Sequence, residues 1–536
     1  MSCSAILTLP QNVDKHAQCE PGRLAIRFLD QRLSYAELSV QSNQLANALA
    51  ARGVCRGDRV GIYMEKSLRT PVAMHGIMKA GAAYVPLDPG APPERLAAMI
   101  NDCGIGHLLC SDARSRALAR LPASVAARLC VWGVQSGKSA GYENVSWAEI
   151  ESADGAAAPA VRMSGADVAY IIYTSGSTGQ PKGIVHTHDS SHAFSRWAAA
   201  EYGLASSDLL SNHAPLHFDL SILDYFAAAV AGCGTSIIPE EFTKLPSSYA
   251  ALIAAQRMTV LYTVPFALVQ LLLRGNLGAH DFGSLRWVIF GGEPMSTKHL
   301  CALMKIWPQA RFDNMYGPAE VNGVSHYEVP ALDGDETSIP IGPLGSHVEG
   351  LIVDDADAEV APGDVGELLV RTPSMMSGYW ARPQLNALAF HHRGQSPDAV
   401  DVFYRTGDLV RADKAAVLHF LGRKDRQVKV RGYRIELDEV EAILAQHPAV
   451  EEAAAVTGVD NSGAVSIEAA VTFKDRACAV TPQELSSHCR KLLPGYAVPG
   501  RITPLPTFAR TTTGKIDRRA LRDRLVVIHS AAAETE

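Results

Sequence analysis

The chain has 536 residues, of which 47% are hydrophobic and 20% are charged. This composition predicts a globular protein of about two to four domains and excludes a disordered chain, a collagen-like repeat and a coiled coil. The formal net charge of −7 argues against a broad basic surface for nucleic acid. The 10 cysteines include no Cys-x-x-Cys pair, which predicts buried free thiols in a reducing cytoplasm.

No segment predicts export or membrane insertion. The short apolar stretch 5–9 has no cationic segment before it. The longest uncharged stretch, 258–273, contains Pro265 and is shorter than the roughly 20 apolar residues that a membrane span needs. We expect this stretch to hold a strand at Val260–Thr263 and a helix at 266–273, in a cytoplasmic protein without membrane contact.

Apolar runs and helix-like patterns alternate along most of the chain. Residues 58–64 and 84–86 have the pattern of strands, 70–79 that of a helix, and the strand-like run 288–290 ends in two glycines. This alternation predicts an α/β fold with mainly parallel sheets. Residues 133–159 are rich in Ser, Gly and Ala, which predicts a loop between subdomains.

The pattern changes near residue 425. A dense charge cluster, 423–426, precedes a strand-like run at 428–430, a helix-like segment and a further strand-like run at 453–456. We therefore predict a large N-terminal domain over residues 1–424 and a smaller α+β domain over residues 425–530, with a hinge at the charge cluster. The tail 531–536 is expected to be frayed.

The segment 173–183, Tyr-Thr-Ser-Gly-Ser-Thr-Gly-Gln-Pro-Lys-Gly, is the most informative. It follows a predicted buried strand, 168–172, and precedes a predicted helix, 190–200. Glycines that turn N–H groups inward, hydroxyl donors and a lysine suit a polyphosphate, although the spacing is not that of a Walker A loop. The candidate phosphate contacts are Thr174, Ser175, Gly176, Ser177, Thr178, Gly179 and Lys182.

This segment resembles the phosphate loop of the adenylate-forming superfamily, and other motifs of that superfamily follow in order. The first two signatures of nonribosomal peptide synthetase adenylation domains are resembled by two segments, Leu-Ser-Tyr-Ala-Glu-Leu and Met-Lys-Ala-Gly-Ala-Ala-Tyr-Val-Pro-Leu-Asp. The resemblance spans about residues 20–525. The motifs that carry it occupy residues 33–38, 78–88, 218–221, 314–320, 404–409, 422–432, 493–499 and 514–518.

The resemblance implies a fold and a reaction. The fold would be a large domain of α/β subdomains with mainly parallel sheets and a small β-barrel-like part, followed by a smaller, mobile α+β domain. The reaction would use ATP and Mg²⁺ to convert a carboxylate into an acyl adenylate with release of pyrophosphate, and would then transfer the acyl group to a thiol. Because two anions must approach each other, catalysis would rest on charge neutralisation and positioning.

The resemblance also implies roles for individual residues. Lys515 and Lys182 would be catalytic cations, with Lys515 bridging the substrate carboxylate and the α-phosphate, and Glu320 would bind Mg²⁺. Asp408 would accept the ribose hydroxyls, and Asp425 would be the hinge between the two domains. Further nucleotide contacts are expected from Gly291, Gly292, Glu293, Met315, Tyr316, Gly317 and Arg423, with Tyr316 packed on adenine.

Asp219 decides the class of carboxylate in this interpretation. In the family, an aspartate at this position pairs with the α-ammonium of an amino acid, and a buried carboxylate left without a cation should reject acids that lack an amine. The alternative role for Asp219 is a helix N-cap. The rest of the pocket is expected to be uncharged and to consist of Leu220, Leu223, Tyr262, Ile289, Gly291, Met315, Gly323 and Val324.

An uncharged lining favours a small or medium apolar amino acid. The set is similar to that of free-standing prolyl-AMP ligases, so L-proline is the first expectation, before alanine, 2-aminobutyrate or valine. Only 21 residues follow Lys515. The thiol is therefore expected on a separate phosphopantetheinylated peptidyl carrier protein, in the biosynthesis of a natural product such as an antibiotic.

Two departures from the family pattern keep alternatives open. Ala319 replaces the usual threonine, which removes one hydroxyl near the phosphate or the metal. Residues 366–380 look more like acyl-CoA ligases, so an acyl- or aryl-CoA ligase is the main rival, and a non-catalytic nucleotide-binding or scaffold protein is the rival from another class. His186, His188 and His192 are expected at a helix start and on the surface rather than in a metal site.

Overall fold

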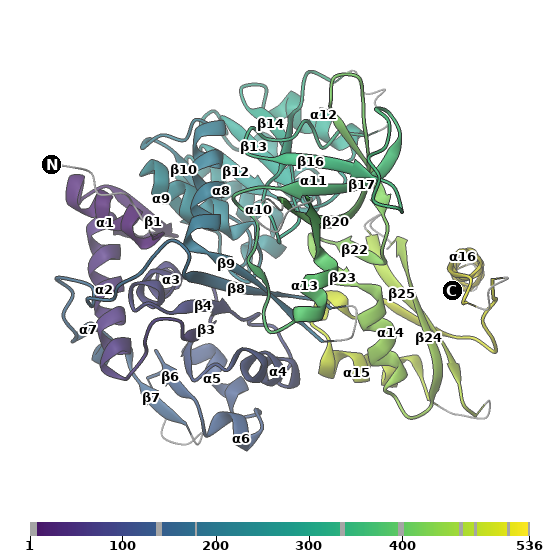
Figure 1. Cartoon of the computed structure of the whole chain (residues 1–536), viewed down its shortest axis with the longest axis horizontal. Helices are drawn as coiled ribbons and strands as arrows, with labels where there is room; N and C mark the ends of the chain where they lie inside the picture. The colour runs from purple at the N-terminus through teal and green to yellow at the C-terminus, as the bar shows by residue number, and fades with distance from the viewer. Residues whose placement is uncertain are drawn as a thin grey trace. The chain divides into compact units, whose positions relative to one another are not determined.

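The computed structural model describes residues 8–135, 142–176, 180–332, 338–394, 401–459, 465–475, 480–511 and 515–533 (Figure 1). The chain divides into two compact units. The first unit consists of Met1–Pro89, Ile100–Tyr173 and Gly183–Lys424, and the second consists of Gly90–Met99, Thr174–Lys182 and Asp425–Glu536.

One eight-stranded sheet of the first unit has the order β15-β14-β13-β12-β10-β11-β1-β2. Its neighbouring strands are parallel except at the pairs β1–β2 and β14–β15. The carboxyl ends of β10, β12, β13 and β14 therefore meet at one edge, where α/β proteins place ligands. The strands are β1 (Leu24–Phe28), β2 (Gln31–Ser34), β10 (Leu209–Asn212), β11 (Gly234–Ile237), β12 (Val260–Thr263), β13 (Trp287–Gly291), β14 (Arg311–Tyr316) and β15 (Ser325–Glu328).

A second eight-stranded sheet has the order β18-β9-β8-β4-β3-β5-β6-β7. The pairs of neighbouring strands from β8 through to β7 are parallel, and β18 pairs with β9 in antiparallel fashion. The strands are β3 (Arg59–Tyr63), β4 (Ala83–Pro86), β5 (His107–Cys110), β6 (Cys130–Trp132), β7 (Glu143–Val145), β8 (Val168–Thr174), β9 (Lys182–Thr187) and β18 (Gly378–Tyr379).

A smaller antiparallel sheet completes the strands of the first unit, in the order β16-β17-β20-β19 with β21 also paired to β20. Together with the two mainly parallel sheets it confirms the predicted fold class. Its strands are β16 (Glu349–Val353), β17 (Val365–Arg371), β19 (Phe390–Arg393), β20 (Asp401–Ala412) and β21 (Leu418–Arg423).

Local sequence signals place the helices. A capping box of Ser34 and Glu37 starts α2, Thr187 and Ser190 do the same for α8, and Pro265 opens α11. The helices before residue 424 are α1 (Pro10–Cys19), α2 (Tyr35–Ala51), α3 (Arg69–Lys79), α4 (Pro93–Cys103), α5 (Asp112–Leu118), α6 (Ala123–Ala126), α7 (Trp147–Glu151), α8 (His188–Glu201), the π-helical η1 (Leu223–Ala227), α9 (Ala228–Ala231), η2 (Phe242–Lys244), α10 (Pro246–Gln256), α11 (Pro265–Arg274), η3 (Leu277–Ala279), α12 (Thr297–Ile306) and α13 (Pro383–Ala389).

The second unit has its own strands and its own core. The hairpin β22–β23 and the three-stranded sheet β24-β25-β26 pack with helices α14 and α15 around a buried cluster that includes Val440, Ile443 and Leu444. The elements are β22 (Gln427–Val430), β23 (Tyr433–Glu436), α14 (Leu437–Ala445), β24 (Val450–Val459), β25 (Val465–Phe473), α15 (Pro482–Leu492), η4 (Gly495–Ala497), β26 (Arg501–Pro504) and α16 (Arg518–Ala533).

One prediction about local structure was wrong. The predicted loop 133–159 contains β7 and α7, because Ser146 and Glu149 form a capping box and Trp147 and Ile150 are buried. The predicted helix 190–200 is confirmed as α8, but strand β9, which was not predicted and whose apolar residues are buried in the sheet, lies between it and the phosphate loop. The loop therefore joins two strands that are adjacent in the sheet.

The cysteines that the structure describes are free thiols, as predicted. Their predicted burial is only partly correct, because Cys19 and Cys55 are exposed. Within the described ranges, no helix is both long enough and apolar enough to cross a bilayer.

Candidate active site

The phosphate loop begins at Thr174, the last residue of β8. A Cβ atom on Gly176 would lie 2.1 Å from the carbonyl oxygen of Gln180, so only glycine permits this close approach. Thr174 Oγ1 is buried and makes no hydrogen bond within the part of the chain that the structure describes. An unmet hydroxyl beside a tight glycine turn fits a phosphate oxygen. Ser177, Thr178 and Gly179 lie outside the described residues.

Ser175 and Lys182 both contact strand β23 within the second unit. The Ser175 hydroxyl donates to the carbonyl oxygen of Arg434 (3.0 Å) and accepts from the backbone N–H of Glu436 (3.2 Å). Lys182 Nζ lies 3.9 Å from Glu436 Oε1. Burial raises the pKa of the Glu436 carboxyl, against the opposing charges of Arg434 and Lys182. A phosphate would have to replace these contacts.

Lys515 immediately precedes Ile516, which forms an isolated bridge with Arg510 shortly before the last helix. The Lys515 carbonyl oxygen accepts from the Thr511 N–H (2.8 Å), and α16 starts at Arg518. The lysine is exposed. Its role at the reacting carboxylate stays a prediction, and Gly514 of its motif lies outside the described residues.

Strands β13 and β14 approach each other closely at the candidate nucleotide edge. Gly291 pairs with Met315, and a Cβ atom on Gly291 would lie 2.3 Å from the Met315 carbonyl oxygen. Gly292 and Glu293 follow Gly291 in the turn after β13. The next residue of β14 is Tyr316, and Gly317 follows the strand.

The carboxylate of Asp408 is buried and hydrogen-bonded on both oxygens. Tyr316 Oη donates to Oδ2 and Arg423 Nη1 donates to Oδ1, while Arg423 Nη2 donates to the carbonyl oxygen of Thr406 (3.1 Å). Burial, with the charge of Asp408, raises the pKa of Tyr316 well above its ordinary value, so the phenol stays a donor. Each carboxylate oxygen can accept a second hydrogen bond, so the pair of ribose hydroxyls fits this residue.

Glu320 is fully buried and hydrogen-bonded to a tyrosine that was not predicted from the sequence. Tyr379 Oη donates to Glu320 Oε1 (2.7 Å), and the Glu320 carbonyl oxygen accepts from the Met376 N–H (2.7 Å). One carboxylate suits Mg²⁺ when phosphates and waters supply the other ligands, so the donor set fits. No group of three or more metal-binding side chains occurs among the described residues. Ala319 packs in an apolar cluster with Ile184 and Val321.

Asp219 lies in the turn before η1, half-buried at the predicted pocket. Its carbonyl oxygen accepts from the Ile222 N–H (3.0 Å). Burial and then the charge of Asp219 raise the pKa of Tyr262, and Asp219 also contributes to the raised pKa of Tyr170. The carboxylate is thus close enough to both phenols to influence their pKa values.

Most of the predicted pocket residues come together around Met315. Tyr262 pairs with Ile289 across β12 and β13, and Tyr262 Oη donates to Met315 Sδ (3.6 Å). A Cβ atom on Gly323 would lie 3.0 Å from the same sulfur. Leu220 and Leu223 belong to the same buried cluster as Tyr262, Ile289 and Met315. Val324 does not, because its side chain packs in the cluster of Ala319.

The three histidines predicted at the surface are buried, and that prediction was wrong. His186, His188 and His192 are 1%, 0% and 2% exposed, respectively. Burial lowers their pKa values to about 4, 3 and 4. His186 Nε2 donates to the Ala319 carbonyl oxygen (2.9 Å), and Asn12 Nδ2 donates to His192 Nε2 (2.6 Å). These histidines join α8 to its neighbours.

Comparisons with known proteins agree with this geometry. Residues 13–380 match the AMP-binding enzyme family, and residues 439–515 match the AMP-binding enzyme C-terminal domain. The chain is 33% identical to an L-proline--[L-prolyl-carrier protein] ligase of Pseudomonas fluorescens strain Pf-5, over 94% of this chain and 96% of that protein. It is also 33% identical to a protein of the same name from Streptomyces coelicolor, over 96% of each chain.

A solved structure shows the same architecture. The amide bond synthetase McbA from Marinactinospora thermotolerans superposes with a TM-score of 0.84 at 25% identity, over 96% of this chain and 99% of McbA. The ordered motifs, the two matched domains and this superposition agree, and the chain belongs to the AMP-binding, adenylate-forming enzyme superfamily.

Proposed function

We propose that this chain is an ATP-dependent ligase that activates an amino acid as aminoacyl-AMP with release of pyrophosphate. The aminoacyl group then passes to the phosphopantetheine thiol of a separate peptidyl carrier protein in natural-product biosynthesis. The observation that carries the proposal is the carboxylate of Asp219, which helps to raise the pKa of Tyr262, in a pocket whose other predicted lining residues are uncharged. A protonated amine is the chemical group that such a pocket accepts.

The residues have distinct roles in this proposal. Asp219 pairs with the ammonium group and so orients the carboxylate toward the nucleotide. Lys515 and Lys182 neutralise the negative charge that accumulates as the carboxylate meets the α-phosphate. Asp408 holds the ribose, and Tyr316 packs on the adenine. Bound at Glu320, Mg²⁺ would add positive charge beside the phosphates.

L-proline is the amino acid that we propose. Its small apolar ring suits the uncharged side chains of Leu220, Leu223, Ile289 and Met315, and its secondary ammonium group still offers two N–H donors to Asp219. The two relatives named as L-proline ligases match the chain almost from end to end, and their names support a separate carrier protein as the acceptor. Alanine, 2-aminobutyrate and valine are the alternatives within the same pocket chemistry.

An acyl- or aryl-CoA ligase is the second candidate. The segment 366–380 favours it by sequence, and this segment supplies Tyr379, which hydrogen-bonds Glu320. Asp219 opposes it, because a fatty or aryl acid would leave that carboxylate without a cation.

ATP–pyrophosphate exchange across the twenty amino acids and a panel of aryl and fatty acids tests the first step. We expect exchange with L-proline and little with acids that lack an amine, and exchange confined to the latter would refute the proposal. Labelled proline is then offered to holo-carrier proteins and to coenzyme A in parallel. We expect label on a carrier protein, whereas label on coenzyme A alone would support the second candidate.

A further inference from the structure

Strand β20 bulges at the residues that present Asp408. In the pairing of β17 with β20, Leu369 faces Arg405, but Glu367 faces Leu409. The two strands therefore lose register between these pairs, and Thr406, Gly407 and Asp408 leave the regular ladder. Bulges of this kind occur beside active sites, where they redirect a side chain.

Hydrogen bonds to β17 and within β20 satisfy the polar groups of the bulged residues. Thr406 Oγ1 donates to the Leu368 carbonyl oxygen (2.7 Å), and the Asp408 N–H donates to Thr406 Oγ1 (3.0 Å). The Gly407 N–H donates to Glu367 Oε1 (3.3 Å). Glu367 is only 5% exposed, so water cannot easily replace this acceptor.

The second oxygen of Glu367 faces two cations. Lys424 Nζ and Arg405 Nη1 each lie 3.5 Å from Glu367 Oε2. The backbone N–H of Lys424 also donates to the Gly407 carbonyl oxygen (2.8 Å), so Lys424 contacts the bulge through its backbone and Glu367 through its side chain. Lys424 is the last residue of the first unit.

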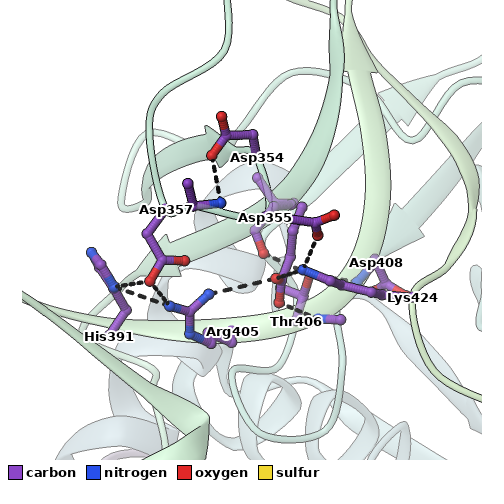
Figure 2. A network of polar contacts seen from close by, with 12 residues as sticks. Asp354, Asp355, Asp357, His391, Arg405, Thr406, Asp408 and Lys424 are labelled. Carbon is purple, nitrogen blue, oxygen red and sulfur yellow. Dashed lines mark hydrogen bonds and ion pairs between the residues drawn. The ribbon is translucent and has the colours of Figure 1, made fainter.

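Acidic residues of the loop after β16 pair with these two cations on the solvent-exposed side of the network. Asp355 Oδ1 lies 2.7 Å from Lys424 Nζ, and Asp357 pairs with Arg405. Figure 2 shows these contacts, with Lys424 reaching Asp355 on one side of the network and Arg405 reaching Asp357 on the other. Each cation thus has its own exposed carboxylate, and Glu367 is the buried carboxylate that both cations share.

We infer that Glu367 is a positioning residue for the nucleotide: it holds the bulge that presents Asp408 and ties this bulge to Lys424, beside the predicted hinge Asp425. The inference rests on the proposed function, in which Asp408 accepts the ribose hydroxyls. Glu367 does not touch the ribose in this scheme. It acts through Gly407 and Thr406, whose backbone sets where the Asp408 carboxylate lies.

AMP affinity of the full chain, measured by calorimetry, tests this role. Glu367→Ala removes the acceptor for the Gly407 N–H and should weaken AMP binding about tenfold. Glu367→Gln has the same shape but can satisfy either Gly407 or the two cations, and should weaken AMP binding about threefold. Glu349→Gln is the matched control, because it breaks an exposed ion pair with Arg371 in the same sheet and should leave the affinity unchanged.

The Michaelis constants distinguish positioning from general loosening of the fold. In pyrophosphate exchange, Glu367→Gln should raise the KM for ATP and leave the KM for the amino acid within twofold. AMP affinity of Glu367→Gln within error of wild type, or an equal rise of both constants, would overturn the inference. A wild-type chain that binds AMP but exchanges with no amino acid would instead refute the proposed function, and the AMP comparison would still test Glu367.

Discussion

Asp313 and His326 form a hydrogen-bonded pair next to strand residues of the candidate amino-acid pocket. His326 Nδ1 donates to Asp313 Oδ2 (3.0 Å), and Tyr202 Oη donates to Asp313 Oδ1 (3.1 Å). Strand register places Asp313 beside Ile289 and His326 beside Met315. The apolar residues Ile289 and Met315 therefore have this polar pair as cross-strand neighbours on the same face of the sheet.

The first prediction concerns pH and stability. The hydrogen bond to Asp313 raises the pKa of His326 above its ordinary value of 6.5, against the effect of burial, and Glu201 and Glu328 act in the same direction as Asp313. The folded state then holds this proton more tightly than the unfolded chain. The stabilisation is fully present below about pH 6.5 and is lost as the pH rises through the raised value.

The free energy of unfolding of wild type and of His326→Gln, measured between pH 6 and pH 9, checks this. The difference between the two proteins should be largest at the acid end and should shrink toward pH 9. His419→Gln is the control, since His419 faces Asp413 at the surface (3.4 Å) and should give a small difference at every pH. A constant difference for His326→Gln would contradict the prediction.

The second prediction concerns Lys515. Lys515→Ala should lower pyrophosphate exchange by about 10²–10³-fold, because a cation aimed at developing charge acts mainly in the transition state. AMP affinity should stay near that of wild type. Lys491→Ala, at an exposed lysine of α15, should leave both quantities unchanged. Unchanged exchange in Lys515→Ala would remove this lysine from the reaction.

The third prediction concerns Asp219. Asp219→Asn keeps the size of the side chain and removes the charge that would pair with the ammonium group. The KM for the amino acid should rise by at least about 100-fold, since losing one partner of a buried ion pair costs about 3–5 kcal/mol. The KM for ATP should not change. If both constants are those of wild type, the ammonium group is bound elsewhere.

The fourth prediction separates two roles of Tyr316. Tyr316→Phe keeps the ring but removes the hydrogen bond to Asp408, and should weaken AMP binding only a few-fold, by about 0.5–1.5 kcal/mol. Tyr316→Ala also removes the surface on which adenine would pack and should weaken AMP binding considerably more. Calorimetric titration with AMP measures both. Equal effects of the two variants would argue against adenine packing on this residue.

Local sequence patterns predicted much of the fold. The strands around residues 59–63 and 83–86 and the helix at Arg69–Lys79 lie where the alternation of apolar residues placed them. The predicted loop 133–159 failed because its composition concealed a short helix with a capping box. The predicted helix 190–200 is present as α8, but strand β9 before it was not predicted, because its place in the sheet depends on partners distant in the chain.

The candidate active site was likewise predicted only in part. Motifs supplied the candidate residues, and the structure brings Tyr262, Ile289, Gly291, Met315 and Gly323 together. Residues that act through others could not be predicted, because their partners are remote in sequence. Tyr379 reaches Glu320 from 59 positions away, and Lys424 reaches Glu367 from 57 positions away. No local pattern marks such pairs.

The bulge of β20 also suggests how a folded variant that is deficient in nucleotide binding could be made. Because Leu369 faces Arg405 while Glu367 faces Leu409, β20 carries two residues more than β17 over this interval. Excising Thr406 and Gly407 would give the two strands equal numbers of residues over this interval and should displace the carboxylate that we propose for the ribose. We expect such a deletion to reduce nucleotide binding more than it reduces folding.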